Sequence, residues 1–127
     1  MKISLNRENF NLALEKLKKE YKIYAPIEIP FRGTFSDTSV IRYSEIDKIE
    51  EICFDKKSHF SAKEVMLPIT QTMFYFTEDG CTMPKEQDKK YLIFLRSCDL
   101  HSVKRVDEVY LNNKFLDIYY KRVRDKV

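Results

Sequence analysis

The sequence predicts an α+β fold, a mixed β-sheet of about four to five strands with helices packed on it; a three-layer α/β fold is the alternative. Three observations favour it. Residues 7–21 repeat apolar side chains at helical spacing, residues 21–29 alternate like a strand, and residues 91–110 form a strand–loop–helix pattern. A length of 127 residues is enough for a single domain, 1–127, with its own core.

The N-terminal third is expected to hold a helix and two strands. In the helix, Phe10, Leu14 and Leu17 share one apolar face, and Asn6 is the expected N-cap. The strand over 21–29 contains Pro26, which has no backbone N–H, so the strand is expected at an edge of the sheet or to end there. Turn residues come next, and 39–43 is expected to form a short strand.

The middle of the chain is expected to be less regular. Residues 46–52 predict a short amphipathic helix, and Ser61 predicts the start of another that Pro68 cuts short. Residues 69–77 are rich in threonine and aromatic residues, which predicts a strand whose Met73, Tyr75 and Phe76 lie in the core. A charged loop is expected over 78–90.

The C-terminal third begins with YLIFL at 91–95, an apolar run typical of a central strand buried on both faces. Asp99 is the expected N-cap of the next helix, because its carboxylate can accept hydrogen bonds from the free amides of the first turn. The inward stripe of that helix is expected to be Leu100, Val103, Val106 or Asp107, and Tyr110. A last helix is expected over 116–126, with Tyr119, Tyr120 and Val123 inward.

Composition excludes several function classes. Lys and Arg number 23 against 20 Asp and Glu, which is not the basic footprint of a nucleic-acid-binding protein. We expect no membrane insertion, because the longest uncharged stretch, 65–77, is well short of the ~20 residues that a spanning helix needs. Two glycines leave no glycine-rich phosphate loop. Three widely spaced cysteines without a CxxC pair, and no signal sequence, favour a cytoplasmic protein with reduced thiols.

Cys98 lies where the predicted strand meets the predicted helix. The carboxyl ends of strands are where α/β sheets bind ligands, and a helix N-terminus stabilises a thiolate. Three interpretations stay open: a small buried hydrophobic residue, a nucleophile, or one metal ligand whose partners lie elsewhere. A nucleophile needs a base, and His59 and His101 are the two histidines of the chain, neither well placed for this role.

The other candidate residues favour structural roles. His59 is expected on a surface loop as a hydrogen-bonded polar residue rather than a ligand or general base. Cys53 lies on an isoleucine-rich face and is expected in the core, whereas Cys81 follows Gly80 in a loop and is expected to be an exposed thiol. The abundance of Tyr and Phe suits docking against another protein surface.

Several segments in order carry a family resemblance. FRGTFSDTSVIRY (31–43), KSHFSAKEVMLPITQTMFYF (57–76) and LIFLRSCDLHSVKRVDEVYL (92–111) resemble the N-terminal part of the iron–sulfur subunit of anaerobic sulfite reductase, and more distantly sulfhydrogenase-type beta subunits. The resemblance covers nearly the whole chain. It implies that 1–127 is the N-terminal domain of a longer subunit, whose ferredoxin-like portion holds two 4Fe-4S clusters through cysteine runs that this sequence lacks.

The resemblance also implies a function for the whole subunit. It would relay electrons from a flavin- and NADH-binding subunit toward a sirohaem subunit that reduces sulfite to sulfide, and this domain alone would be neither catalytic nor cofactor-binding. The family's Arg-x-Cys-Asp motif falls on Arg96, Cys98 and Asp99. Cys98 is then a possible cluster ligand completed by residues outside this chain, and Asp99 a helix cap or a hydrogen-bond partner to a ligand. The alternatives are a stand-alone interaction or regulatory module and a small cysteine-dependent enzyme.

Overall fold

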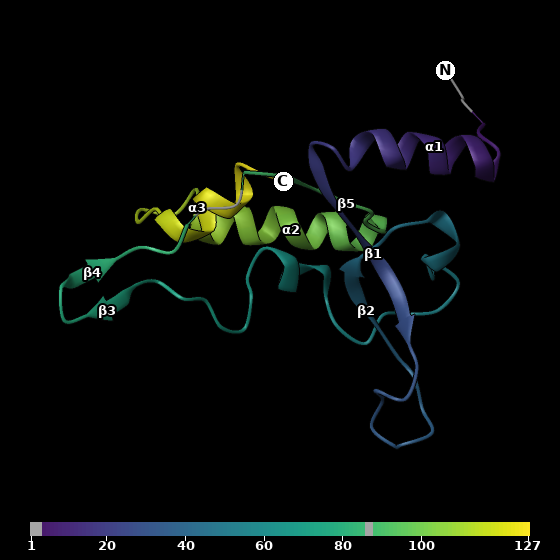
Figure 1. The fold of residues 1–127 in the computed structure, drawn as a ribbon, viewed down its shortest axis with the longest axis horizontal. Coiled ribbons are helices and arrows are strands. Elements are labelled where there is room, and N and C mark those ends of the chain that lie inside the picture. The colour runs from purple at the N-terminus through teal and green to yellow at the C-terminus, as the bar shows by residue number, and fades with distance from the viewer. Residues whose placement is uncertain (1–3, 86–87) are drawn as a thin grey trace.

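The computed structural model describes residues 4–85 and 88–127 and confirms the mixed α+β fold (Figure 1). In chain order the elements are α1 (Arg7–Leu17), β1 (Tyr21–Ile29), β2 (Val40–Glu45), the 3-10 turns η1 (Ile49–Glu51) and η2 (Ala62–Val65), β3 (Tyr75–Thr77), β4 (Gly80–Thr82), β5 (Lys90–Ile93), α2 (Ser97–Tyr110) and α3 (Ile118–Arg124). The strands are divided between a three-stranded sheet and a separate two-stranded hairpin, whose second strand, β4, was not predicted.

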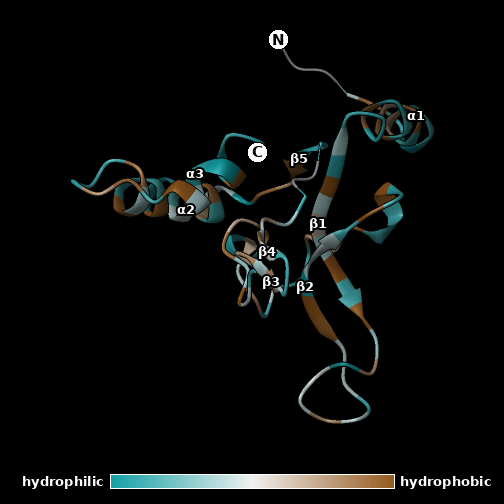
Figure 2. Ribbon diagram, turned by 60° about the vertical axis from the view of Figure 1, so that its left-hand side comes forward, coloured by the Kyte–Doolittle hydropathy of each residue, from teal (hydrophilic) through white to brown (hydrophobic). Residues whose placement is uncertain are grey.

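The three-stranded sheet has the order β2-β1-β5. β1 pairs antiparallel with β2, with Ile29 opposite Val40 and Tyr24 opposite Glu45, and parallel with β5 from Tyr21 to Tyr24. Hydrophobic stretches run along β1 and β2 (Figure 2). This mixed pairing is what the predicted mixed sheet requires.

Pro26 lies in the central strand β1, so the expectation that its strand occupies an edge was wrong. The parallel pairing with β5 ends at Tyr24, two residues before the proline. The Pro26 carbonyl accepts a hydrogen bond from the Cys53 amide (2.7 Å) rather than from β5. The missing N–H of Pro26 is on that same side of β1, beyond the end of β5, so no sheet hydrogen bond is lost.

α1 covers one side of the sheet, and its predicted cap is confirmed. The Asn6 side chain accepts a hydrogen bond from the Asn9 amide (2.9 Å). Leu14 of α1 packs with Ile23 and Ala25 of β1 and with Ile46 in the first of two core clusters. The expected helix over 46–52 is only the 3-10 turn η1.

β5 is an edge strand, which corrects the prediction that 91–95 is central. Its side chains nevertheless alternate between two cores. Leu92 and Phe94 pack against the first cluster, whereas Ile93 and Leu95 pack against a second cluster formed by Met66, Val103 and Tyr120. The apolar run therefore reflects packing on both faces, which does not require a strand neighbour on both sides.

α2 and α3 form the body of the second core cluster. Val103 of α2 and Tyr120 of α3 are buried, and the rings of Tyr110 and Tyr120 lie 5.1 Å apart. Asp117 caps α3 by accepting hydrogen bonds from the amides of Tyr119 and Tyr120. The Tyr91 amide donates to the Lys126 carbonyl, which places the end of the chain beside β5.

Residues 69–85 form an arm that ends in the β3–β4 hairpin, far from α1 in Figure 1. The expected strand over 69–77 is confirmed only for Tyr75–Thr77. Met73, Tyr75 and Phe76, expected in the core, are exposed, Phe76 to 81%. The error is physical: a threonine- and aromatic-rich run has strand propensity, but a core position needs a covering layer, and none of the described residues covers this hairpin.

Candidate functional site at the start of α2

The Arg-x-Cys-Asp segment connects β5 to α2. β5 ends at Ile93, and α2 begins at Ser97 with Arg96 as its N-cap. Asp99 therefore lies within the first turn, and the prediction that it caps the helix was wrong. The helix starts earlier than expected because Arg96 already has the extended backbone of a cap and its carbonyl accepts the Leu100 amide (3.0 Å).

Cys98 is exposed in this first turn, so the interpretation of it as a small buried hydrophobic residue was wrong. The inward stripe also differs from expectation. Val103, Val106 and Tyr110 pack into the core, but Leu100 is 48% exposed. The Cys98 thiol therefore lies on the first turn of a 14-residue helix, at the positive end of the helix dipole.

Asp99 is held by a residue that sequence reasoning did not identify. The hydroxyl of Tyr43, in β2, donates a hydrogen bond of 2.9 Å to Asp99 Oδ2. Tyr43 is only 6% exposed. Burial, together with the Asp99 carboxylate, raises the pKa of Tyr43 far above its usual 10.0, so its hydroxyl is a fixed donor at neutral pH. The bond fixes the first turn of α2 against the sheet.

Arg96 joins the junction to the loop over 53–56. Its Nη2 atom donates to the carbonyls of Lys56, Cys53 (3.4 Å) and Phe54 (3.4 Å). Because three carbonyls converge on one guanidinium, this loop is attached to the residue immediately before α2. The Arg96 of the motif thus has a defined structural role in positioning the loop.

Cys53 belongs to that loop, and it is half-buried rather than in the core as predicted. Its thiol donates to Asp55 Oδ1 (3.2 Å). Burial raises the pKa of the Cys53 thiol, and the hydrogen bond to Asp55 raises it further, so this sulfur is a poor nucleophile at neutral pH. Cys81 is exposed, as expected, but it lies in the strand β4 and not in a loop, so the charged loop predicted over 78–90 was wrong at 80–82.

His59 is hydrogen-bonded to β2, and His101 is exposed on the surface of α2. His59 is exposed on a loop, as predicted, and exchanges two hydrogen bonds with Ile41 of β2: its Nδ1 accepts from the Ile41 amide (3.0 Å) and its amide donates to the Ile41 carbonyl (2.7 Å). His101 is exposed on α2, beside Lys104, Arg105 and Glu108 around a shallow hollow. No hydrogen bond among the described residues joins either histidine to Cys98.

No group of three or more His, Cys, Asp or Glu side chains within 4–85 and 88–127 is arranged to hold a metal ion. Cys98 can therefore offer one sulfur ligand, but the described residues do not supply a complete set of ligands. Within the same ranges, no helix is long and apolar enough to cross a bilayer.

A second polar network that sequence reasoning missed joins α2 to α3. Asp107 accepts hydrogen bonds from Arg124 Nε (2.9 Å) and from the Tyr120 hydroxyl (2.7 Å). Burial raises the pKa of Asp107, but the hydrogen bonds from Arg124 and Tyr120 outweigh it and lower the pKa overall. The sequence signal for this network was Asp107 itself, a carboxylate beside the apolar residues of α2 that face the core. A charge that is partly buried requires a partner.

Comparisons with known proteins give a partial match. The chain is 28% identical over 124 residues to the beta subunit of sulfhydrogenase 2 from Pyrococcus furiosus. The match covers 96% of this chain and 34% of that subunit, so the chain spans about a third of the length of this curated relative. No family model matches the chain, and no solved structure matches it. The chain is thus similar, over nearly its whole length, to one part of a subunit of a larger enzyme.

Proposed function

We propose that this chain is a non-catalytic domain of an electron-transfer subunit in a multi-subunit oxidoreductase. The observation that carries the proposal is the similarity to a sulfhydrogenase beta subunit over 96% of the chain. A domain matching a third of a subunit is expected to position cofactors and partners that the rest of the protein and its complex supply. The activity of the complex is then not expected from this chain alone.

The finer proposal is the N-terminal domain of the iron–sulfur subunit of an anaerobic sulfite reductase. Its support is the ordered set of motifs from the Arg-Gly turn at 32–33 to the Arg-x-Cys-Asp segment at 96–99. In that assignment the subunit holds 4Fe-4S clusters outside residues 1–127. It relays electrons from a flavin- and NADH-binding subunit to a sirohaem subunit, which reduces sulfite to sulfide.

Exposed aromatic surface supports a docking role. Phe31 and Phe35 are exposed in the β1–β2 connection, Phe76 on the arm, and Phe115 between α2 and α3. Large exposed aromatic side chains are the residues that dominate binding energy when a partner covers them. These regions are therefore the proposed contacts with the remainder of the subunit or with its partner subunits.

Cys98 is the proposed ligand of an additional 4Fe-4S cluster, completed by residues outside this chain. The described residues supply one candidate ligand for such a cluster, the exposed Cys98 thiol. It lies at the N-terminus of α2, next to the end of a strand. Such a cluster would supply one-electron transfer. Asp99 would act as a hydrogen-bond partner near the ligand, with its position fixed by Tyr43 (2.9 Å).

Iron analysis of the anaerobically purified full-length protein tests this function. We expect iron and acid-labile sulfide in the wild type, and less iron with an altered visible spectrum in Cys98→Ala. Cys81→Ala is the matched control, because it removes another exposed thiol and should leave the iron content unchanged. Iron content unchanged in Cys98→Ala would contradict the ligand role, and a full-length protein without iron would contradict the electron-transfer function.

A stand-alone interaction or regulatory module is the second candidate, and the exposed aromatic arm is the observation that favours it. The two candidates predict different gene sequences beyond Val127. Ferredoxin-type cysteine runs in the same reading frame support the electron-transfer subunit, whereas a stop codon immediately after Val127 supports the module.

A further inference from the structure

The hairpin on the arm is paired along one edge only. β3 pairs antiparallel with β4, from Tyr75 opposite Thr82 to Thr77 opposite Gly80, and none of the described residues pairs with the other edge of β3. In Figure 1, β4 lies between β3 and α3, so the free edge of β3 is directed away from the helices. Two such short strands are at best marginally stable on their own in water.

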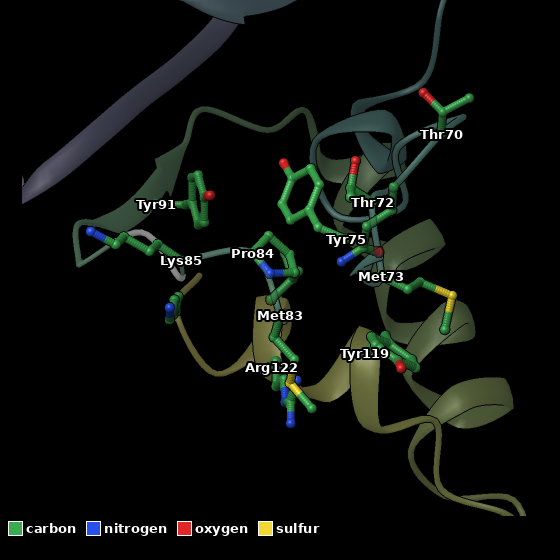
Figure 3. A pocket seen from close by; sticks show the side chains of 13 residues that line it. Thr70, Thr72, Met73, Tyr75, Met83, Pro84, Lys85, Tyr91, Tyr119 and Arg122 are labelled. Carbon is green, nitrogen blue, oxygen red and sulfur yellow. The ribbon is translucent and has the colours of Figure 1, made fainter. Parts of the chain in front are cut away.

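The two faces of this hairpin have different surroundings. Met73 and Tyr75 line a cavity together with Tyr119 of α3, so one face of the arm is directed toward the helices (Figure 3). Phe74 and Phe76 do not line that cavity, and their ring centroids lie 6.3 Å apart. Because successive side chains of an extended chain alternate between its faces, these two rings lie on the outer face. That face is apolar, and none of the described residues covers it.

The free edge of β3 also lacks the features by which natural sheets protect an edge strand. No residue from 69 to 77 is charged and none is proline, although charged side chains and prolines are usual means of keeping an edge from pairing. The acidic residues Glu78 and Asp79 lie in the turn beyond the strand. Residues 69–77 therefore have the composition of a strand with neighbours on both edges.

Residues 69–74 would extend β3, but β4 is unable to pair with them. Continuing the register that sets Tyr75 opposite Thr82 would set Met73 opposite Pro84, which has no N–H to donate. No strand is present from 69 to 74, although the threonine and aromatic content of 69–77 favours one. The other edge has no such obstacle, so a strand added there can pair with the whole of 69–77.

We propose that a strand from the remainder of the longer subunit, outside residues 1–127, pairs with 69–77 along the free edge of β3, and that the chain next to this strand covers Phe74 and Phe76. Strand addition of this kind combines backbone hydrogen bonds with contacts to alternate side chains. The proposal rests on the function proposed above, because it requires the longer subunit.

The length of the relative favours this occupant. The matched part is 34% of the sulfhydrogenase 2 beta subunit, so about two thirds of that relative lie outside the match and include enough chain to supply a strand. A segment of the same polypeptide is also present at a high effective concentration, which neither a second copy nor a separate partner has.

Hydrogen–deuterium exchange followed by mass spectrometry tests the proposal on the full-length protein and on residues 1–127 alone. Peptides that cover 69–77 should exchange at least about tenfold more slowly in the full-length protein, because their backbone amides become hydrogen-bonded. Equal exchange of 69–77 in the two proteins would overturn the proposal. A reading frame that ends at Val127 would also overturn it.

Phe76→Lys places a charge on the outer face and should weaken strand addition in the full-length protein, bringing the exchange of 69–77 to within about threefold of its rate in residues 1–127 alone. Phe76 is 81% exposed, so the same substitution in residues 1–127 should leave the urea midpoint unchanged. The matched control is Leu12→Lys, which replaces an exposed apolar residue of α1 and should leave the exchange of 69–77 unchanged. Slow exchange that persists in full-length Phe76→Lys would contradict the covering of the outer face.

Other occupants give different results. Protection of 69–77 in residues 1–127 alone that increases between about 1 µM and 100 µM protein would assign the edge to a second copy and overturn the proposal. Protection that appears only after the other subunits are added would assign the edge to a separate partner, with the same consequence.

Iron analysis of the same full-length samples separates this inference from the proposed function. Unprotected 69–77 in a protein that contains iron would contradict the strand addition and leave the electron-transfer function standing. Protected 69–77 in a protein without iron would support the strand addition and contradict the electron-transfer function.

Discussion

Tyr43 Oη donates a 2.9 Å hydrogen bond to Asp99 Oδ2, which connects β2 to the first turn of α2 although the two residues are 56 positions apart. Asp99 follows Cys98 directly, so this bond also limits where the Cys98 thiol can lie. The position of the candidate ligand is thus set by the packing of a helix on a sheet.

Replacing Tyr43 with phenylalanine should destabilise the chain by about 1–2 kcal/mol, because the hydroxyl is a buried donor to a carboxylate. Urea denaturation of the purified chain measures the change. In a double-mutant cycle with Asp99→Asn, the two losses should not add, since both substitutions weaken the same bond. Tyr75→Phe, on the exposed arm, should change the stability by less than about 0.5 kcal/mol. Additive losses would mean that the bond contributes nothing.

Alkaline pH should weaken the fold through Tyr43 and Tyr120. Burial, and hydrogen bonds to Asp99 and Asp107, raise the pKa of both phenols above the usual 10.0. The unfolded chain therefore loses these protons first, so their contribution is complete below about pH 10 and falls as the pH rises above it. The titration of each phenol should steepen the decline in the free energy of unfolding by at most about 1.4 kcal/mol per pH unit.

Unfolding free energies from about pH 9 to 11 check this prediction. Tyr43→Phe and Tyr120→Phe should each make the decline with pH shallower than in the wild type, although both variants are less stable at about pH 8. Equal slopes in the wild type and in both variants would show that neither phenol is held in its protonated form.

Asp107→Asn should destabilise the chain by about 1–3 kcal/mol at about pH 7, because it leaves Arg124 without its carboxylate partner. The native pKa of Asp107 is lowered below its usual 3.8, so its contribution is present above that pH and is lost as the pH falls through the lowered value. The difference between variant and wild type should therefore shrink below about pH 4.

Asp125→Asn is the matched control for Asp107→Asn. Asp125 pairs with Lys121 at 2.5 Å across one turn of α3, but both side chains are exposed. The loss of this pair in Asp125→Asn should lower the free energy of unfolding by no more than about 0.5 kcal/mol. Denaturation curves at about pH 3 and pH 7 for both variants measure the contrast, and equal losses at neutral pH would contradict the importance of the α2–α3 network.

Thiol labelling should distinguish the three cysteines by their rates of reaction. Cys98 and Cys81 are exposed and should react rapidly with a disulfide reagent at about pH 8, whereas Cys53 should react slowly because burial and Asp55 raise its pKa. Mass spectrometry of peptides from the labelled chain identifies each site. Rapid labelling of Cys53 together with slow labelling of Cys98 would contradict the placement of both residues.

Local sequence patterns predicted the elements that residue spacing, caps and turns specify. The apolar spacing and the Asn6 cap indicated α1, and the alternating YKIYAPIEI matched β1 in full. The strand–loop–helix pattern at 91–110 also matched β5 and α2. These elements combine periodicity with a cap or a turn, so their type does not depend on distant neighbours.

Features that depend on distant partners could not be predicted in the same way. Pro26 is accommodated in a central strand because β5 ends before reaching it, which no local pattern encodes. The position of Asp99 depended on where α2 begins, and its partner Tyr43 comes from β2. The exposure of Phe76 depended on whether anything covers the arm.

A comparison of two electron donors tests the proposed electron-transfer role most directly. Sulfite reduction by the purified complex would be measured with NADH and with reduced methyl viologen, with and without the subunit that contains this chain. Loss of the NADH-driven rate alone, while the viologen-driven rate of the sirohaem subunit persists, is the predicted result. An unchanged NADH-driven rate in the absence of the subunit would contradict the proposal.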